Sequence, residues 1–219
     1  MKILITGNPS KDITKSIAGL YDDIHTVSRS SISTYELDLS IDENITKLAK
    51  ISLNYDIFIN CALIPNFGQT KILQSVWTEW KSSNKSGTII NFGSAVDYYF
   101  RPDNRLYPIE KRSLRDLSCS LSKHVNWFNS KIKCTYFSFG GVSTEKTIRQ
   151  WSHYDHFSPD EIATYVKWII DSPAHANIDE IHVTPIQPES KKEMKKNIKS
   201  DVKMEWTSGD SRTYLINEE

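Results

Sequence analysis

The sequence predicts an α/β protein with a doubly wound parallel sheet, covered by helices on both faces. Two observations support this. Short apolar runs alternate with amphipathic, helix-like runs from the first residue onward, and no linker or internal repeat divides the chain. Such alternation is typical of strand–helix–strand units. We therefore expect a single domain over residues 1–187, followed by a polar extension over residues 188–219.

The composition is that of an ordinary globular protein. The 219 residues suffice for one sizeable core, with 38% hydrophobic and 25% charged residues. Lys and Arg balance Asp and Glu at 27 each, which argues against nucleic acid and anionic membranes as partners. No apolar run approaches the roughly 20 residues that cross a bilayer. The chain enters a strand at Lys2, and its three cysteines lack metal spacing, so we expect no signal peptide, free thiols and a cytoplasmic protein.

Each predicted element follows from its residue pattern. Short runs rich in Ile, Val, Phe, Tyr and Thr, bounded by turn residues, predict strands. Apolar residues spaced three and four apart predict helices. The strands are predicted at 2–6, 25–28, 35–38, 55–60, 88–92, 131–139 and 179–184, and the helices at 12–21, 41–50, 68–82, 104–129 and 159–170. In the extension, 188–199 carries five Lys against two Glu, and a hairpin is predicted at 202–216.

Three residues in the middle of the chain form a candidate catalytic group. Ser94 follows the predicted strand 88–92, and Tyr107 and Lys111 lie four residues apart on the predicted helix 104–129. That spacing places both side chains on one helix face. A neighbouring ammonium favours the phenolate, so we expect it to lower the phenol pKa from about 10. The alternative interpretation is two exposed residues on a polar helix face.

The spacing of these three residues resembles that of the short-chain dehydrogenase/reductase family, which has a Rossmann-type fold. Twelve residues separate Ser94 from Tyr107, and three separate Tyr107 from Lys111. Residues 158–163 and 172–187 resemble a branch that includes NADP-dependent 3-hydroxy acid and serine dehydrogenases. The resemblance implies an oxidoreductase that interconverts a carbonyl and an alcohol on a small molecule with NADP, or alternatively NAD. Tyr107 would exchange the proton, Ser94 would hold the carbonyl oxygen, and Lys111 would hold the nicotinamide ribose.

The first strand-to-helix turn resembles the family's phosphate-binding run of Thr-Gly-x-x-x-Gly-Ile-Gly but departs from it. Only Gly7 is retained, while Asp12 and Thr14 stand at the later glycine positions. Larger side chains restrict the approach of the backbone to phosphates. We expect Asn8 and Ser10 to supply substitute donors. An ordinary loop that binds no ligand is the alternative interpretation.

Other cofactor contacts are expected from the resemblance. Arg29 follows the second predicted strand, where a guanidinium suits the 2′-phosphate of NADP. Asp38 follows the third predicted strand, where the family holds the adenine amine. Asn60 and Ala62 match part of the family's Asn-Asn-Ala-Gly run. Gly141, Val142 and Thr144 match part of its Pro-Gly-x-Val-x-Thr run.

Asn66 precedes the predicted helix 68–82, and the resemblance makes it the candidate that completes a proton relay to Lys111. A helix cap is the alternative role. The interval from Asn60 to Asn66 is shorter than usual in the family, so one helix is expected to be missing. That helix normally joins a subunit contact, which puts the usual tetramer in doubt and leaves a homodimer as the expected assembly.

The altered turn motivates a second hypothesis about function. In it, the chain is a catalytically inactive relative of these enzymes, kept as a binding or regulatory module. An intact Ser, Tyr and Lys group favours the enzyme. A metal site at His153, Asp155 and His156 lacks a further ligand at suitable spacing, so no metal is expected.

Overall fold

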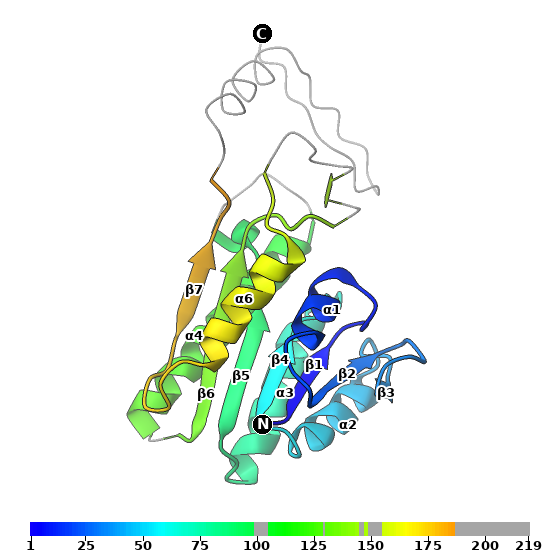
Figure 1. Cartoon of the computed structure of the whole chain (residues 1–219). Helices are drawn as coiled ribbons and strands as arrows, with labels where there is room; N and C mark the ends of the chain where they lie inside the picture. The colour runs from blue at the N-terminus through cyan, green and yellow to red at the C-terminus, as the bar shows by residue number, and fades with distance from the viewer. Residues whose placement is uncertain (99–104, 129, 145–146, 149–154, 187–219) are drawn as a thin grey trace.

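The computed structural model describes residues 1–98, 105–128, 130–144, 147–148 and 155–186. Seven strands form one sheet in the order β3-β2-β1-β4-β5-β6-β7, and every pair is parallel (Figure 1). The predicted Rossmann-type α/β fold is therefore confirmed. The strands are β1 Ile3–Thr6, β2 Ile24–Ser28, β3 Tyr35–Glu36, β4 Ile57–Asn60, β5 Gly87–Phe92, β6 Ile132–Phe139 and β7 Glu180–Val183.

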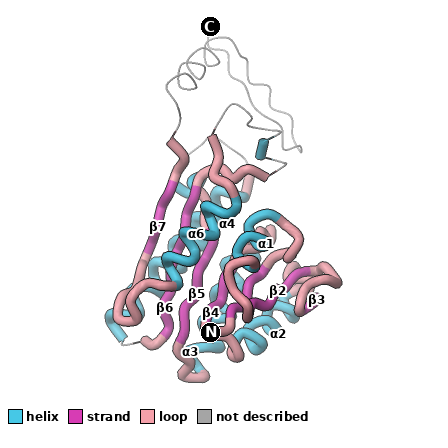
Figure 2. Tube along the Cα trace, viewed as in Figure 1, coloured by secondary structure: helices cyan, strands magenta, loops and turns pink. Residues whose placement is uncertain are grey.

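Helices cover both faces of the sheet (Figure 2). One face packs against α2, α3 and α4, and the other against α1 and α6. The central strands β1, β4 and β5 consist mainly of buried apolar residues because both of their faces are covered. The helices are α1 Asp12–Ala18, α2 Asp42–Ser52, α3 Gly68–Ser82, α4 Tyr107–Phe128 and α6 Pro159–Ile170, with a 3₁₀ turn, η1, at Ala95–Tyr98.

The strand order reverses between β1 and β4. The chain runs outward from β1 to β3, then crosses back to place β4 on the other side of β1. In open parallel sheets, ligands bind at such a switch point, beyond the carboxyl ends of the strands. The residues that follow β1, β4 and β5 therefore line the expected crevice.

The element bounds agree closely with the sequence prediction. The helices at 68–82 and 159–170 are found as predicted, and the cysteines are free thiols. The long helix begins at Tyr107, with Pro108 in its first turn, where proline is tolerated. The predicted hairpin 202–216 and His153 lie outside the described residues, and the predicted domain boundary stays a prediction. No helix in the described part of the chain is long and apolar enough to cross a bilayer.

Candidate active site

Ser94, Tyr107 and Lys111 lie together at the carboxyl end of β5. The Ser94 carbonyl accepts a hydrogen bond from the Asp97 amide at 3.1 Å, which turns the chain into η1. The Ser94 side chain hydrogen-bonds to Tyr107. Nζ of Lys111 lies 5.8 Å from the centroid of the Tyr107 ring. The two α4 residues therefore share a face, as the four-residue spacing predicts.

The pKa of Tyr107 is raised from its ordinary value. Burial is the largest cause, the hydrogen bond with Ser94 opposes it, and the nearby Asp97 adds to it. The expectation of a lowered phenol pKa is therefore wrong for this arrangement. The Lys111 ammonium lies over the ring of Tyr107 and makes its hydrogen bonds elsewhere.

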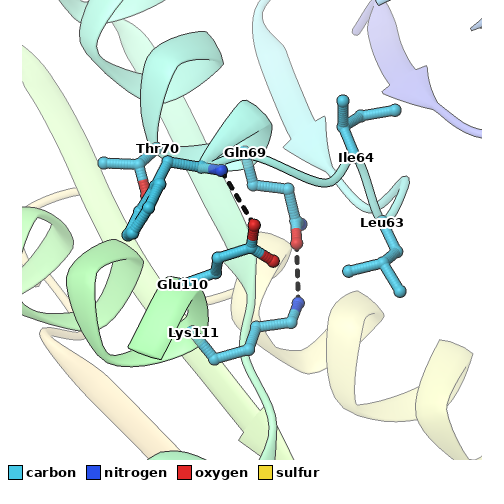
Figure 3. A pocket seen from close by; sticks show the side chains of 7 residues that line it. Leu63, Ile64, Gln69, Thr70, Glu110 and Lys111 are labelled. Atoms are coloured by element: carbon cyan, nitrogen blue, oxygen red, sulfur yellow. Dashed lines mark hydrogen bonds between the residues drawn. The ribbon is translucent and has the colours of Figure 1, made fainter. Parts of the chain in front are cut away.

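Lys111 is buried, and its ammonium is held by two oxygens. Nζ donates to Oε1 of Gln69 at 2.7 Å and to the carbonyl of Phe92 at 2.7 Å. Burial lowers the pKa of Lys111 to about 8. Figure 3 shows the hydrogen bond between Gln69 and Lys111. Both residues line a small cavity of about 10 Å³, near the lower limit for one water.

The crevice floor is closed by Thr6, the last residue of β1. Its hydroxyl oxygen accepts hydrogen bonds from the amides of Cys61 and Ala62, both at 3.0 Å. The Asn60 side chain points into the core and donates to the Gln69 carbonyl at 2.9 Å and to Oδ1 of Asn91 at 3.1 Å. Asn60 therefore supports the site from beneath, while Ala62 lies at the crevice.

The turn after β1 is narrow. Gly7 has φ of 143°, and a Cβ there would lie 2.3 Å from Oγ1 of Thr14. Asn8 closes the next turn, since its Oδ1 accepts hydrogen bonds from the amide and hydroxyl of Ser10 at 2.9 and 2.8 Å. Asp12 opens α1 with φ of 23°. The expected donors on Ser10 are thus used within the loop, whereas Asn8 takes part only as the acceptor.

Arg29 and Asp38 lie near each other beyond β2 and β3. The pKa of Asp38 is lowered mainly by hydrogen bonds from the hydroxyl and amide of Ser40, and further by the charge of Arg29. Arg29 is exposed and Asp38 is partly exposed, and each follows the carboxyl end of its strand.

The segment after β6 is held by a parallel bridge between Val142 and Phe157. The Phe157 amide donates to the Gly141 carbonyl at 2.9 Å, and the Ser143 amide donates to the Phe157 carbonyl at 2.8 Å. The Thr144 hydroxyl caps the next turn by accepting from the Thr147 amide at 3.2 Å. These bonds fix the predicted contact residues Gly141, Val142 and Thr144 at the carboxyl edge of the sheet.

A dinucleotide of the kind that the resemblance implies fits the donor set at both ends of this crevice. Lys111 has a third N–H beyond its two hydrogen bonds among the described residues, and Arg29 offers a guanidinium beside Asp38. The middle of the crevice is narrow, because the Thr14 side chain occupies the space beside Gly7.

The chain is similar to known proteins in sequence and in fold. No protein-family model matches it. An uncharacterized oxidoreductase of Staphylococcus saprophyticus is 25% identical over 199 residues, which cover 73% of this chain and 78% of the relative. The structure of a 4-hydroxyisoleucine dehydrogenase complexed with NADH matches with a TM-score of 0.67 at 18% identity, covering 84% of this chain and 96% of that one. The serine dehydrogenase of Escherichia coli matches with a TM-score of 0.66 at 18% identity, covering 87% and 99%.

The chain has the fold of a short-chain dehydrogenase. The resemblance predicted from the spacing of Ser94, Tyr107 and Lys111 is thereby confirmed.

Within this short-chain dehydrogenase fold, Gln69 takes the place beside Lys111 that the sequence suggested for Asn66. Asn66 is exposed in the turn before α3, with φ of 59°, and is not among the hydrogen-bond partners of Lys111. The expected cap is not found either, because the N-cap of α3 is Phe67 and lacks a side-chain cap bond.

The apolar spacing of α3 predicts that Gln69 is buried, although Gln69 is not part of the family motif. Gln69 stands three, four and seven residues before Ile72, Leu73 and Val76, which are all buried on the inner face of α3. A polar residue in that apolar series needs a buried partner. Lys111 supplies one, and Nε2 of Gln69 donates to the Asn60 carbonyl at 3.0 Å.

Proposed function

We propose that the protein is an NAD(P)-dependent oxidoreductase that interconverts a carbonyl and an alcohol on a small molecule, with Tyr107 as general acid and base. The observation that carries this proposal is the meeting of Ser94, Tyr107 and Lys111 at the end of β5, next to the switch point of the sheet. The names of the similar proteins, which are oxidoreductases and dehydrogenases, support it.

The chain's own residues handle the proton. In the direction of reduction, the Tyr107 hydroxyl gives its proton to the carbonyl oxygen of the substrate, and in oxidation the phenolate takes it back. The Ser94 hydroxyl donates a hydrogen bond to the same oxygen and holds it beside Tyr107. A bound nicotinamide supplies or accepts the hydride in this chemistry.

The electrostatics favour a protonated Tyr107 at rest. Burial raises the pKa of Tyr107, so the phenol is neutral and ready to donate. The pKa of Lys111 is lowered to about 8, so its ammonium still carries charge near neutral pH. The hydrogen bond to Oε1 of Gln69, at 2.7 Å, holds the ammonium in place. Its positive charge stabilises the phenolate that forms as the proton leaves.

The residues proposed to hold the dinucleotide come from the ends of five strands, β1, β2, β3, β4 and β6, and from α4. Arg29 favours NADP over NAD because a guanidinium binds a 2′-phosphate through paired, charge-assisted hydrogen bonds. Lys111 is proposed to hold the nicotinamide ribose. Asn60, expected from the sequence as a contact, is buried with its side chain in the core, so its proposed role is to support the site from beneath. The other proposed contacts are Gly7, Asn8, Ser10, Asp38, Ala62, Gly141, Val142 and Thr144.

The substrate is proposed to carry a carboxylate. Arg105 is exposed two residues before Tyr107, and its positive charge acts against burial, the largest influence on the raised pKa of Tyr107. Two similar structures are enzymes named for amino acids that bear a hydroxyl and a carboxylate, serine dehydrogenase and 4-hydroxyisoleucine dehydrogenase. A small hydroxy acid therefore heads the panel of substrates to try.

Calorimetric titration of NADPH and NADH against the purified protein tests the cofactor. Saturable binding of at least one nucleotide is expected, and the absence of any binding would remove the enzyme hypothesis. Tyr107→Phe is then expected to abolish turnover at unchanged nucleotide affinity. Tyr35→Phe is the matched control, because the Tyr35 hydroxyl hydrogen-bonds to Tyr55 at the far edge of the sheet. Unchanged turnover in Tyr107→Phe would refute the assignment of the acid.

A further inference from the structure

The hydroxyl of Tyr136, on β6, touches three parts of the candidate site. It hydrogen-bonds to Oδ2 of Asp97, lies 3.2 Å from the Lys111 carbonyl, and lies beside the backbone of Ser94. A Cβ at Gly93 would lie 2.4 Å from the hydroxyl oxygen, so only glycine leaves room for this contact. One buried hydroxyl thus joins the backbone of the serine to the backbone of the lysine.

The number of hydrogens at this hydroxyl restricts the state of Asp97. A tyrosine hydroxyl has one hydrogen to donate and can accept further hydrogen bonds. A carboxylate at Asp97 and the carbonyl of Lys111 would both require the single hydroxyl hydrogen. If Asp97 carries a proton, it donates to Tyr136, which is then free to donate to Lys111.

The surroundings of Asp97 also favour the protonated form. Asp97 is only 2% exposed, and its Oδ1 is buried without a hydrogen-bond partner among the residues that the structure describes. The guanidinium of Arg115 is engaged with both carboxylate oxygens of Glu180, at 2.6 and 3.1 Å. A buried carboxylate without a paired cation is costly. Burial is accordingly the largest influence on the pKa of Asp97, which is raised.

Titratable or charged groups face Asp97 from its own turn and from three packed elements. Of these, the hydrogen bond with Tyr136 and the charges of Arg115 and His182 favour the ionised form of Asp97, whereas burial and the charge of Glu180 oppose it. The whole set is Tyr98 of η1, Tyr107, Lys111, Arg112 and Arg115 of α4, Tyr136 of β6, and Glu180 and His182 of β7.

We infer that Asp97 is a neutral carboxylic acid that donates its proton to the Tyr136 hydroxyl, and that the two side chains position Ser94 and Lys111. The effect on turnover rests on the proposed function, whereas the protonation of Asp97 does not. A neutral Asp97 also keeps a negative charge away from Tyr107, whose pKa an ionised Asp97 raises.

The pH dependence of unfolding tests the protonation without any assay of activity. Above the ordinary aspartate pKa of about 4, the unfolded chain releases the Asp97 proton and the folded chain keeps it. The wild type therefore loses stability as pH rises, and Asp97→Asn, which cannot ionise, does not share that loss. We expect the stability of Asp97→Asn relative to wild type to increase between about pH 4 and about pH 7. A constant or decreasing difference would overturn the inference.

Infrared spectroscopy gives a direct second readout. At neutral pH the wild type is expected to show a carboxylic-acid C=O stretch that Asp97→Asn lacks. Asp171→Asn is the matched control, because Asp171 is an exposed partner of Lys167 and its replacement is expected to leave the band in place. Absence of the band from the wild type would contradict a neutral Asp97.

Steady-state kinetics tests the positioning role. Asp97→Asn keeps an N–H donor for Tyr136, so its kcat is expected to stay near that of wild type. Tyr136→Phe removes the joining hydroxyl and is expected to lower kcat roughly ten- to hundredfold, with KM little changed. Equal losses in both variants would refute positioning through the donated proton. If the wild type itself shows no turnover, the proposed function fails, and the unfolding and infrared results still decide the state of Asp97.

Discussion

The Lys111 ammonium donates a hydrogen bond of 2.7 Å to the side-chain oxygen of Gln69, which joins the first turn of α3 to the first turns of α4. Glu110 adds a second tie, since its Oε1 accepts from the Phe67 amide at 3.0 Å. The position of the lysine charge therefore depends on how α3 packs, as well as on α4.

Gln69→Leu is expected to destabilise the fold by about 1.5–3 kcal/mol, because it removes a buried hydrogen bond to a charged group. It also leaves the Lys111 ammonium with a single partner, so turnover is expected to fall. Urea unfolding and steady-state kinetics measure the two effects. Gln74→Leu, on the exposed face of the same helix, is the control and is expected to change stability by less than about 0.5 kcal/mol. Equal losses in the two variants would contradict the role of Gln69.

The buried Lys111 predicts that stability rises with pH in alkaline solution. Its pKa in the folded protein is about 8, below the ordinary 10.5, so between these values the folded chain has released a proton that the unfolded chain still binds. The free energy of unfolding should therefore increase from about pH 8 to about pH 10.5, by roughly 3 kcal/mol for this group.

Lys111→Met should remove this part of the pH dependence. Lys71→Met serves as the control, because Lys71 is exposed and pairs with Asp42 at 2.9 Å on the surface. Urea unfolding at several pH values in this range compares the three proteins. A wild-type curve parallel to that of Lys111→Met would show that the lysine does not titrate as expected.

Gly7→Ala is expected to destabilise the protein by about 1–3 kcal/mol, because its φ of 143° strains any L residue and the new Cβ meets Thr14 at 2.3 Å. Gly19→Ala provides the contrast. The backbone there is helical with φ of −71°, and the nearest atom to a new Cβ is 3.5 Å away, so it should be neutral or stabilising by up to about 1 kcal/mol. Thermal unfolding of both variants checks this, and a tolerated Gly7→Ala would contradict the geometry of the turn.

Arg29→Ala is expected to weaken NADPH binding roughly ten- to hundredfold and to leave NADH binding nearly unchanged, since a charge-assisted hydrogen bond contributes about 1.5–3 kcal/mol. Calorimetric titration of both nucleotides gives the ratio. Lys50→Ala, on the exposed side of α2, controls for the loss of one positive charge. An equal loss for both nucleotides would argue against recognition of a 2′-phosphate.

Most of the fold could be predicted from the sequence because its strands and helices obey simple periodicities. The run before Ser94 is mostly apolar, with Ile89, Ile90 and Phe92 buried in β5, and the apolar spacing in 68–82 gave the bounds of α3. The short β3, Tyr35–Glu36, was predicted two residues too long, since Leu37 and Asp38 follow the strand without pairing.

The site could be predicted only as far as motif spacing reaches. The spacing of Tyr107 and Lys111 placed them on one face, but the pKa of Tyr107 depends on burial, which spacing does not reveal. Gln69 and Asp97 were missed for a related reason. Each is a polar residue whose partner lies on another element, and pairing across elements appears only once the chain has folded.

The hydroxyl of Thr6 engages the two amides at the end of β4, so the floor of the crevice has little hydrogen-bonding capacity left for an anion. A nucleotide would therefore be bound mainly by cationic side chains at the two ends of the crevice, and less by backbone amides in the middle of the crevice. Attraction of that kind weakens as salt screens it. Nucleotide affinity in this protein should accordingly depend strongly on ionic strength.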